Sequence, residues 1–536
     1  MFVRQRRNKS GSVSIQIILK KSGLYRVVKH IGTAQPNSIE LEYLLTYAEE
    51  LKIRLETGGQ LTLDGFLTKR KEAELAGFAS RFVIPNVYKV GFFEVFGLVY
   101  DELGFASIIP SPLFKDLVIT RIAKPTSKLS TQRWLKKYAG SQIKKDSIYR
   151  LLDKLTPTIK RKVCSHVFKQ TYKTSKTIVN IIFFDATTLH FESFTPDDFR
   201  KLGFSKVGKH RQPQIVIGLM VANTGIPIGY EVYPGNKFDG RTIRKALEKV
   251  QKQYSAKQVV FVADASMLSK FNVGLIQKAG FGYIMAAKIK NLDRKTQAQV
   301  LDFNQYKNSH LELKLKPQSQ PEYRLIVTYS DLRARKNQHD RRRNLEKLQK
   351  KISPKQKLTK EQLNQLGKMK YLHIKGKAEV VMDYKAVQND SHWDGLKGYA
   401  TNMYDLSADE VVERYRELWQ VERAFRIAKT DLKIRPVFHY KAKRIKAHLL
   451  LVFVSLVVSR ILEQKLSGLG LGLERIIENL ESVIEIPLKD KKLGTTLVIR
   501  PEQSEITRKI YYALGLPLKT GTYPHSCSKP QKGVLL

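Results

Sequence analysis

Cysteine is scarce in this sequence. Only two occur in 536 residues, Cys164 and Cys527. So few cysteines, so far apart, exclude a disulfide-rich scaffold and a zinc module built from cysteines. Negative charge is also scarce, because 49 acidic residues stand against 95 lysines and arginines, which leaves a net charge of +46.

Long apolar segments are missing as well. The most apolar stretch, residues 447–462, is shorter than the roughly 18 residues that a membrane helix needs, and it contains Ser455, Ser459 and Arg460. It predicts a buried helix and no membrane span. Three of the first seven residues are arginines and no apolar run follows them, so no signal peptide is expected.

The positive charge is spread along the whole chain, which favours contact with a large polyanion through several domains. Nucleic acid is the expected partner, because each lysine or arginine near a phosphate releases counterions. The alternative is an ordinary soluble protein with a basic bias. Apolar residues make up 42% of the chain, enough for several buried cores, and the length suggests three or four domains.

The N-terminal part reads as a basic β-hairpin at residues 10–31 and an amphipathic helix at 38–55. Residues 131–138 and 145–155 predict two helices about a break at 139–141, which fits a helix-turn-helix. The second helix carries candidate DNA contacts at Lys145, Arg150 and Lys154. An ordinary helical hairpin remains the alternative.

From residue 177 the pattern predicts an α/β domain. Buried strands at 177–185 and 258–264 each end on an aspartate, Asp185 and Asp264. Strands at 213–222, 228–233 and 283–288, and helices at 240–254 and up to Lys278, complete a β-β-β-α-β-α-β order. This order predicts a mixed sheet flanked by helices.

The next hundred residues form a different, partly β piece. Strands are expected at 311–315, 323–329 and 371–384, with a basic helix at 331–351 between them. A long helix from the capping box of Ser407 and Glu410 to about Leu432 follows, and then an apolar helix at 444–466. The tail from Gly521 is expected to be disordered.

Asp185, Asp264 and Glu422 are the candidate catalytic residues. Like charges at close range are unfavourable unless a cation lies between them, and Mg²⁺ prefers oxygen ligands. Two such ions could support phosphoryl transfer. Each acid also has a simpler interpretation: Asp185 and Asp264 could cap turns or helices, and Glu422 could pair with Arg426.

The sequence around Glu422 is expected to place a phenol, a carboxylate and cations on one face of a helix. Tyr415, Glu422 and Lys429 are seven residues apart, and Arg426 lies one turn from Glu422. A carboxylate beside a phenol and cations suits metal binding next to a phosphate backbone, so Tyr415, Arg426 and Lys429 are candidate DNA contacts.

This helix resembles the Tyr-x-x-Arg-x-x-x-Glu-x-x-x-x-x-x-Lys block of bacterial insertion-sequence transposases of the DDE class. Tyr415, Glu422 and Lys429 match, whereas Leu418 stands where the family has its arginine. Arg416 or Arg426 could serve instead. Further stretches resemble the family's other blocks: residues 184–188, 225–236, 262–267, 435–439 and 447–448.

The resemblance implies a ribonuclease-H-like catalytic domain at 177–289 and 405–466. It also implies an insertion at 290–404, an N-terminal region at 1–115, a DNA-binding region at 116–176 and a C-terminal region at 467–536. In related enzymes an insertion-domain tryptophan stacks on an extruded base. Trp393 is the candidate here, with a core tryptophan as the alternative.

The activity implied is DNA transposition. The protein would bind terminal inverted repeats, cut there with two Mg²⁺ ions (or Mn²⁺), and join the 3′-hydroxyls to target DNA as a homodimer on paired ends. A bacterial, cytoplasmic, nucleoid-associated protein without membrane contact is implied. The rivals are a ribonuclease-H-like nuclease without strand transfer and a domesticated, non-catalytic DNA-binding protein.

Overall fold

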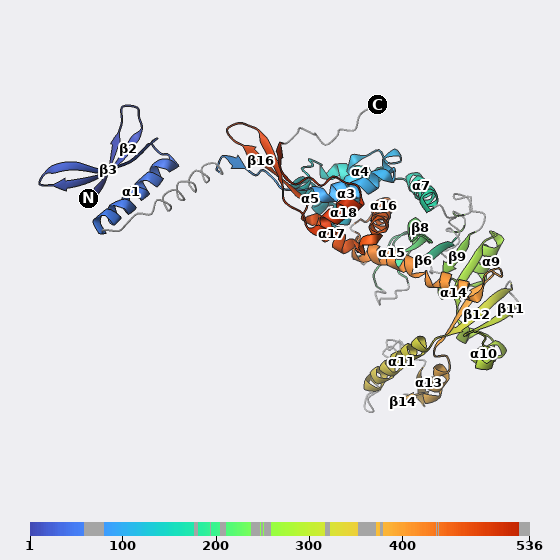
Figure 1. Cartoon of the computed structure of the whole chain (residues 1–536). Helices are drawn as coiled ribbons and strands as arrows, with labels where there is room; N and C mark the ends of the chain where they lie inside the picture. Colours follow the sequence, from blue (N-terminus) through green and yellow to red (C-terminus); the bar gives the residue numbers. More distant parts are fainter. Residues whose placement is uncertain are drawn as a thin grey trace. The chain divides into compact units, whose positions relative to one another are not determined.

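The computed structural model describes most of the chain as two compact units. Residues 58–79, 176–180, 193–194, 204–210, 237–246, 248–249, 251–258, 317–321, 352–370, 376–378, 436, 438 and 525–536 lie outside the description. One unit contains residues 1–90, 483–503 and 518–536, and the other contains residues 91–482 and 504–517 (Figure 1). The predicted domain boundaries near 115 and 176 fall inside the second unit.

The first unit begins with a three-stranded antiparallel sheet, β1 (Phe2–Arg7), β2 (Val13–Lys21) and β3 (Leu24–Ala34). The expected hairpin at 10–31 is confirmed, with β1 as an additional strand. Two register shifts in the β2–β3 pair break the alternation, so that neighbours Ile17 and Ile18 are both buried. Helix α1 (Ile39–Thr57) follows Ser38, whose hydroxyl accepts the Leu41 N–H at 3.1 Å.

A second sheet in this unit joins strands from both ends of the chain. Strand β16 (Ile484–Asp490) pairs with β17 (Thr496–Arg500) and with the short strands β4 (Phe82–Val83) and β5 (Tyr88–Lys89). Strand β18 (Gly521–Pro524) pairs with β17. Disorder from Gly521 onward is therefore wrong for residues 521–524; the rest of the tail lies outside the described residues.

The second unit is a mixed α/β structure built on an eight-stranded sheet of order β11-β12-β15-β10-β9-β6-β7-β8. Strands β6 (Ile181–His190), β7 (Gln214–Ala222) and β8 (Pro227–Pro234) form an antiparallel meander. Strand β9 (Val260–Ala263) lies parallel between β6 and β10 (Gly282–Ala287), with α9 (Lys270–Lys278) between β9 and β10 in sequence. These elements confirm the predicted strands; most of the helix expected at 240–254 lies outside the described residues.

The expected insertion extends the same sheet. Strands β11 (His310–Leu315), β12 (Tyr323–Tyr329) and β15 (Leu396–Thr401) are antiparallel to their neighbours, and β15 joins them to β10. Helices α10 (Arg294–Leu301), α11 (Asp331–Lys351) and α13 (Tyr384–Ser391) accompany them. The single strand expected at 371–384 is instead a hairpin of β13 (Leu372–Lys375) and β14 (Glu379–Met382).

The described part of this unit contains further α-helices. They are α3 (Val90–Glu102), α4 (Pro112–Ala123), α5 (Lys128–Tyr138), α6 (Lys145–Lys154), α7 (Pro157–Ser175), α14 (Ala408–Arg416), α15 (Trp419–Thr430), α16 (Ala442–Lys465), α17 (Leu473–Glu481) and α18 (Glu505–Ala513). The two helices of the predicted helix-turn-helix are confirmed as α5 and α6, and Gly140 between them has φ +67°.

Helix α16 contacts α4, α6, α15 and β8. Among the described helices it alone is long and apolar enough to cross a membrane, yet 89% of its most apolar window is buried inside the protein. This burial agrees with the prediction of a buried helix.

The long helix expected from Ser407 to Leu432 is divided at Glu417 and Leu418. The Leu418 N–H donates to the Tyr415 carbonyl and the Val421 N–H to the Leu418 carbonyl, the i to i+3 bonds of a tight 3₁₀ turn. The capping box of Ser407 and Glu410 is present as predicted. Tyr415 thus belongs to α14, whereas Glu422 and Lys429 belong to α15.

Candidate active site

Two aspartates lie side by side on neighbouring parallel strands. The paired residues of β6 and β9 end with Phe184 opposite Ala263, so the next residues are Asp185 and Asp264. Strand β6 continues to His190, so Asp185 lies within the strand and not at its end as predicted. Phe184 and Ala263 are fully buried, so the core holds both aspartates in place from behind.

Each aspartate is also fixed locally. One Asp185 carboxylate oxygen accepts the Ala186 N–H at 2.7 Å, and one Asp264 oxygen accepts the Ala265 N–H at 2.6 Å. Asp264 caps the short 3₁₀ helix 265–267, so the alternative of a helix cap holds for this residue. Strand β6 runs on through Thr187, so Asp185 does not cap a turn.

Glu422 lies in the first turn of α15, a helix that contacts β6 and β7. Its side chain is exposed, and the described ion pairs do not include one with Arg426. Within the part of the chain that the structure describes, no three His, Cys, Asp or Glu side chains lie close enough to hold one metal ion. The three acids have the carboxylate oxygens that Mg²⁺ prefers as ligands. As they are placed here, they do not lie close enough together to bind one ion jointly.

Tyr415 lies near two of these acids, Asp264 and Glu422. It is 7% exposed, and its ring meets the ring of Tyr399 edge-on with centroids 5.1 Å apart. Burial raises the pKa of the Tyr415 phenol, and the negative charges of Asp264 and Glu422 act in the same direction. Asp264 and Glu422 are thus both near Tyr415, although the helix between Tyr415 and Glu422 is broken.

Lys429 reaches the strand that carries Asp185. Its ammonium group donates a hydrogen bond to the Thr187 hydroxyl at 2.7 Å and lies 5.4 Å from the centre of the Phe425 ring. Thr187 is two residues after Asp185 on β6, on the same face of the strand. Arg426, also predicted to bind DNA, is exposed on α15.

Lys397 on β15 is a residue that the sequence analysis missed. Its ammonium group lies 4.2 Å from the centre of the Tyr415 ring and 5.1 Å from that of Tyr399. Burial and the charge of Arg333 lower the pKa of Lys397 to about 8, while Asp264 and Glu422 act in the opposite direction. A single lysine in a strand gives no sequence signal that could have singled it out.

Trp393 lies in the turn between α13 and β15, partly buried against the hydrophobic core of the sheet. The next residue, Asp394, binds the Arg341 guanidinium of α11 through both carboxylate oxygens. Trp393 is thus partly packed on the core and partly accessible, and its stacking on a base stays a prediction.

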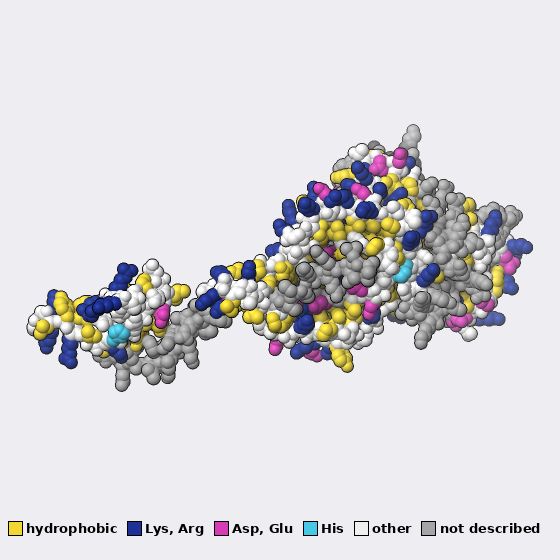
Figure 2. All heavy atoms as spheres, turned by 90° about the horizontal axis from the view of Figure 1, so that it is seen from above, with side chains coloured by type: hydrophobic (Ala, Val, Ile, Leu, Met, Phe, Trp, Pro, Cys, Tyr) yellow, Lys and Arg dark blue, Asp and Glu magenta, His cyan; other side chains and the backbone are white. Residues whose placement is uncertain are grey.

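The basic residues predicted on α6 are all at the surface. Lys145, Arg150 and Lys154 are exposed, whereas Ile148 and Leu152 of the same helix are fully buried. Figure 2 shows lysine and arginine side chains over much of the visible face, with fewer acidic ones. The surface charge thus agrees with the composition.

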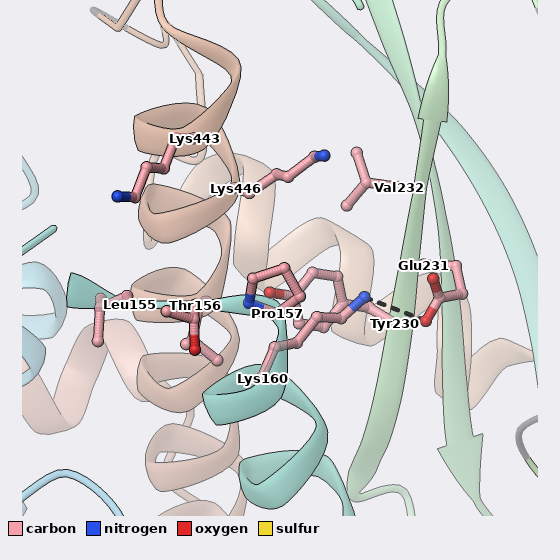
Figure 3. Close-up of a pocket in the computed structure, with 10 residues that line it drawn as sticks. Leu155, Thr156, Pro157, Lys160, Tyr230, Glu231, Val232, Lys443 and Lys446 are labelled. Carbon is pink, nitrogen blue, oxygen red and sulfur yellow. Dashed lines mark hydrogen bonds and ion pairs between the residues drawn. The ribbon is translucent and has the colours of Figure 1, made fainter. Parts of the chain in front are cut away.

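A cavity of about 460 Å³ lies apart from the acids, between α7, β8 and α16 (Figure 3). Lys160 of α7 lines this cavity. Its ammonium group lies 3.0 Å from a Glu231 carboxylate oxygen and 4.3 Å from the centre of the Tyr230 ring, both on β8. Lys443 and Lys446 of α16 line the other side. None of the predicted site residues lines this cavity.

Residues 179–458 match the family described as the transposase DDE domain. The match spans more than half of the chain and includes all three acids, so the chain belongs to this family. The protein is a transposase of the DDE class.

Solved transposase structures show weaker similarity. A piggyBac transposase synaptic complex with hairpin DNA has a TM-score of 0.36 at 13% identity, covering 82% of this chain and 87% of that one. A Mos1 transposase paired-end complex with the left transposon end has a TM-score of 0.15 at 14% identity, covering 30% and 53%. A Mos1 mariner paired-end complex with Mn has a TM-score of 0.14 at 13% identity, covering 30% and 54%. No curated protein matches the chain.

Proposed function

We propose that this protein is a bacterial insertion-sequence transposase with a ribonuclease-H-like catalytic domain. It binds the terminal inverted repeats of its element, cleaves the DNA there and joins the 3′-hydroxyl ends to target DNA. The observation that carries the proposal is the parallel register that puts Asp185 beside Asp264, in a segment that belongs to the transposase DDE domain family.

In this proposal Asp185, Asp264 and Glu422 hold two divalent cations, Mg²⁺ or Mn²⁺. Such cations supply an activated oxygen nucleophile and stabilise the leaving oxygen. The exposure of Asp264 and Glu422 supports access of a DNA strand to the site. The protein contributes mainly position and charge, which is where most of the catalysis of phosphoryl transfer lies.

The basic residues act on the DNA strand. Lys429, held by Thr187 beside Asp185, is placed to contact a phosphate next to the scissile bond. The exposed side chains of Lys145, Arg150 and Lys154 on α6 are placed to contact the backbone of the element end. Two ends must be cut together, so we propose a homodimer on paired ends in the bacterial cytoplasm, associated with the nucleoid.

The test uses the full-length chain and a supercoiled plasmid that carries both sequences flanking its gene. With Mg²⁺, we expect breaks at the inverted repeats that leave 3′-hydroxyl ends, and joined products in a second, target plasmid. Breaks without any joined product would point to a nuclease that lacks strand transfer. Specific binding without breaks would point to a non-catalytic DNA-binding protein.

A further inference from the structure

The surroundings of Lys397 are unusual for a strand lysine. Strand β15 lies between β10 and β12; Lys397 pairs with Thr328 of β12, and the pairing with β10 begins at the next residue, Gly398. Its ammonium group lies over the rings of Tyr415 and Tyr399, at 4.2 and 5.1 Å from their centres. A partly buried cation costs free energy, which two aromatic faces offset only in part.

Lys397 is not neutralised by an ion pair. Asp264 and Glu422 are near enough to act on its charge, but the ion pairs of the described residues include none with Lys397. A lysine that served only to balance these acids would contact one of them directly. The tyrosine rings instead hold the ammonium group near both acids and bound to neither.

Two further cations act on the charge of Lys397 from other elements, and α14, which carries one of them, contacts both β9 and β15. Arg333 of α11 and Arg416 of α14 both act on the charge of Lys397, and both are exposed. Three cations beside two acids, with the cations unpaired among the described residues, is an arrangement that suits a bound phosphate. In the proposed function the acids would hold metal ions, and these cations are placed to hold oxygens of a phosphate bound there.

Leu418 stands at the position of the family's motif arginine, so one positive charge of the motif is missing here. Leu418 is 7% exposed and apolar, so the position of the family's motif arginine supplies no charge here. Lys397 of β15 lies more than twenty residues earlier in the chain than Leu418, and its ammonium group lies against Tyr415, three residues before Leu418.

We propose that Lys397, with Arg333 and Arg416, binds a phosphate of the DNA strand held at Asp264 and Glu422. Lys397 thereby supplies the positive charge that Leu418 does not. This inference rests on the proposed function, because it requires DNA at these acids. No covalent step involves Lys397.

The experiment compares Lys397→Met, Lys397→Arg and Lys314→Met with the wild-type chain. Methionine keeps the apolar stem that packs on the tyrosines but removes the charge. Lys314 is the matched control, since its ammonium group also lies over a tyrosine ring, 5.8 Å from the centre of Tyr404, but at an exposed position on β11.

The first readout is binding of an inverted-repeat duplex in EDTA over a range of salt concentrations. Lys397→Met should reduce the slope of log affinity against log salt by about 0.9, the value for one lost phosphate contact. Lys397→Arg and Lys314→Met should keep the wild-type slope. A wild-type slope for Lys397→Met would overturn the inference, even if its melting temperature fell.

The second readout is single-turnover cleavage of pre-bound DNA with Mg²⁺. Lys397→Met should be slower by about ten- to a hundredfold, with partial rescue in Lys397→Arg. A wild-type chain that binds but never cleaves would contradict the proposed function, while the salt slope would still decide the role of Lys397. Cleavage by Lys397→Met at the wild-type rate would contradict the inference alone.

Discussion

At the scale of single residues, two aspartates could be found from sequence because each follows a nearly continuous run of β-branched and aromatic residues. Such a run predicts a buried strand, and a carboxylate after it must be held at the sheet. The parallel neighbours β6 and β9 place Asp185 beside Asp264. Lys397 and the Thr187 partner of Lys429 could not be predicted, since both contacts join segments far apart in the chain.

Lys429→Ala should slow cleavage by about one to two decades, as expected for the loss of a charge-assisted phosphate contact. Single-turnover cleavage of pre-bound DNA, with thermal melting alongside, measures this. Thr187→Val is the control, because it removes the hydrogen bond to Lys429 but leaves the charge. Equal losses of rate in both variants, tracking equal drops in melting temperature, would assign Lys429 to a structural role.

His439 predicts a pH dependence of stability. Burial, together with the charges of Lys128 and Arg444, lowers the pKa of His439 to about 4. In the unfolded chain, where the histidine pKa is near 6.5, His439 is therefore protonated between about pH 4 and pH 6.5, whereas in the folded chain it is neutral. Stability should fall as the pH drops from about 6.5 to 4, and that loss should cease below this range.

The measurement is the free energy of unfolding between pH 7 and pH 4 for the wild-type chain and His439→Gln. Glutamine cannot take up the proton, so the variant should lose less stability over this range. His448, which is also buried with a lowered pKa, leaves part of the dependence in place. Parallel curves for the two proteins would contradict the assignment for His439.

At the scale of elements, strand and helix positions followed the sequence patterns more closely than their ends did. The break at Glu417 and Leu418 has no glycine or proline to mark it, so the pattern predicted one long helix. Strand β6 continues past Asp185 because Ala186–His190 pair with β7 across the sheet. Residues 521–524 form a strand only because β17 offers an edge to pair with.

Replacing Gly225 tests how closely the turn between β7 and β8 packs against its neighbours. It has φ +79°, and a Cβ there would lie 2.4 Å from a Gln420 side-chain oxygen and 2.8 Å from an Arg460 nitrogen. Gly225→Ala should cost more than about 1 kcal/mol of unfolding free energy, from backbone strain and from displaced partners. Denaturant unfolding of the full-length chain gives the value.

Gly274→Ala is the matched control for this change. Gly274 lies within α9, and nothing lies within 4 Å of the added Cβ. Alanine there should stabilise the protein by roughly 0.5–1 kcal/mol, because glycine is the poorer helix former. A Gly225→Ala variant as stable as Gly274→Ala would contradict the described packing of the hairpin.

At the scale of the whole molecule, composition predicted a nucleic-acid partner, and the family match assigned a transposase. Composition could not show how the segments group. Helices α4 and α6 pack on α16, and α7 packs on β8, so the predicted DNA-binding region shares a compact unit with the candidate active site. Tests of DNA binding are therefore best made on the full-length chain.

Replacing Lys145, Arg150 and Lys154 of α6 together by glutamine should weaken binding of the inverted-repeat duplex and lower the salt slope by up to about 2.7. The control replaces three exposed cations of α17 and α18, Arg475, Arg508 and Lys509. Fluorescence anisotropy over a salt series measures both. Equal salt slopes for the two triple variants would contradict the prediction that α6 contacts the DNA.

The most direct test of the central claim is end cleavage by Asp185→Asn, Asp264→Asn and Glu422→Gln, beside the exposed control Glu413→Gln on α14. Each change keeps the shape of the side chain and removes a metal-binding charge. With Mg²⁺ and pre-bound inverted-repeat DNA, the three site variants should lose cleavage while binding the duplex as tightly as wild type, and Glu413→Gln should cleave normally. Cleavage by any of the three site variants at near the wild-type rate would contradict the assignment of these acids as the catalytic centre.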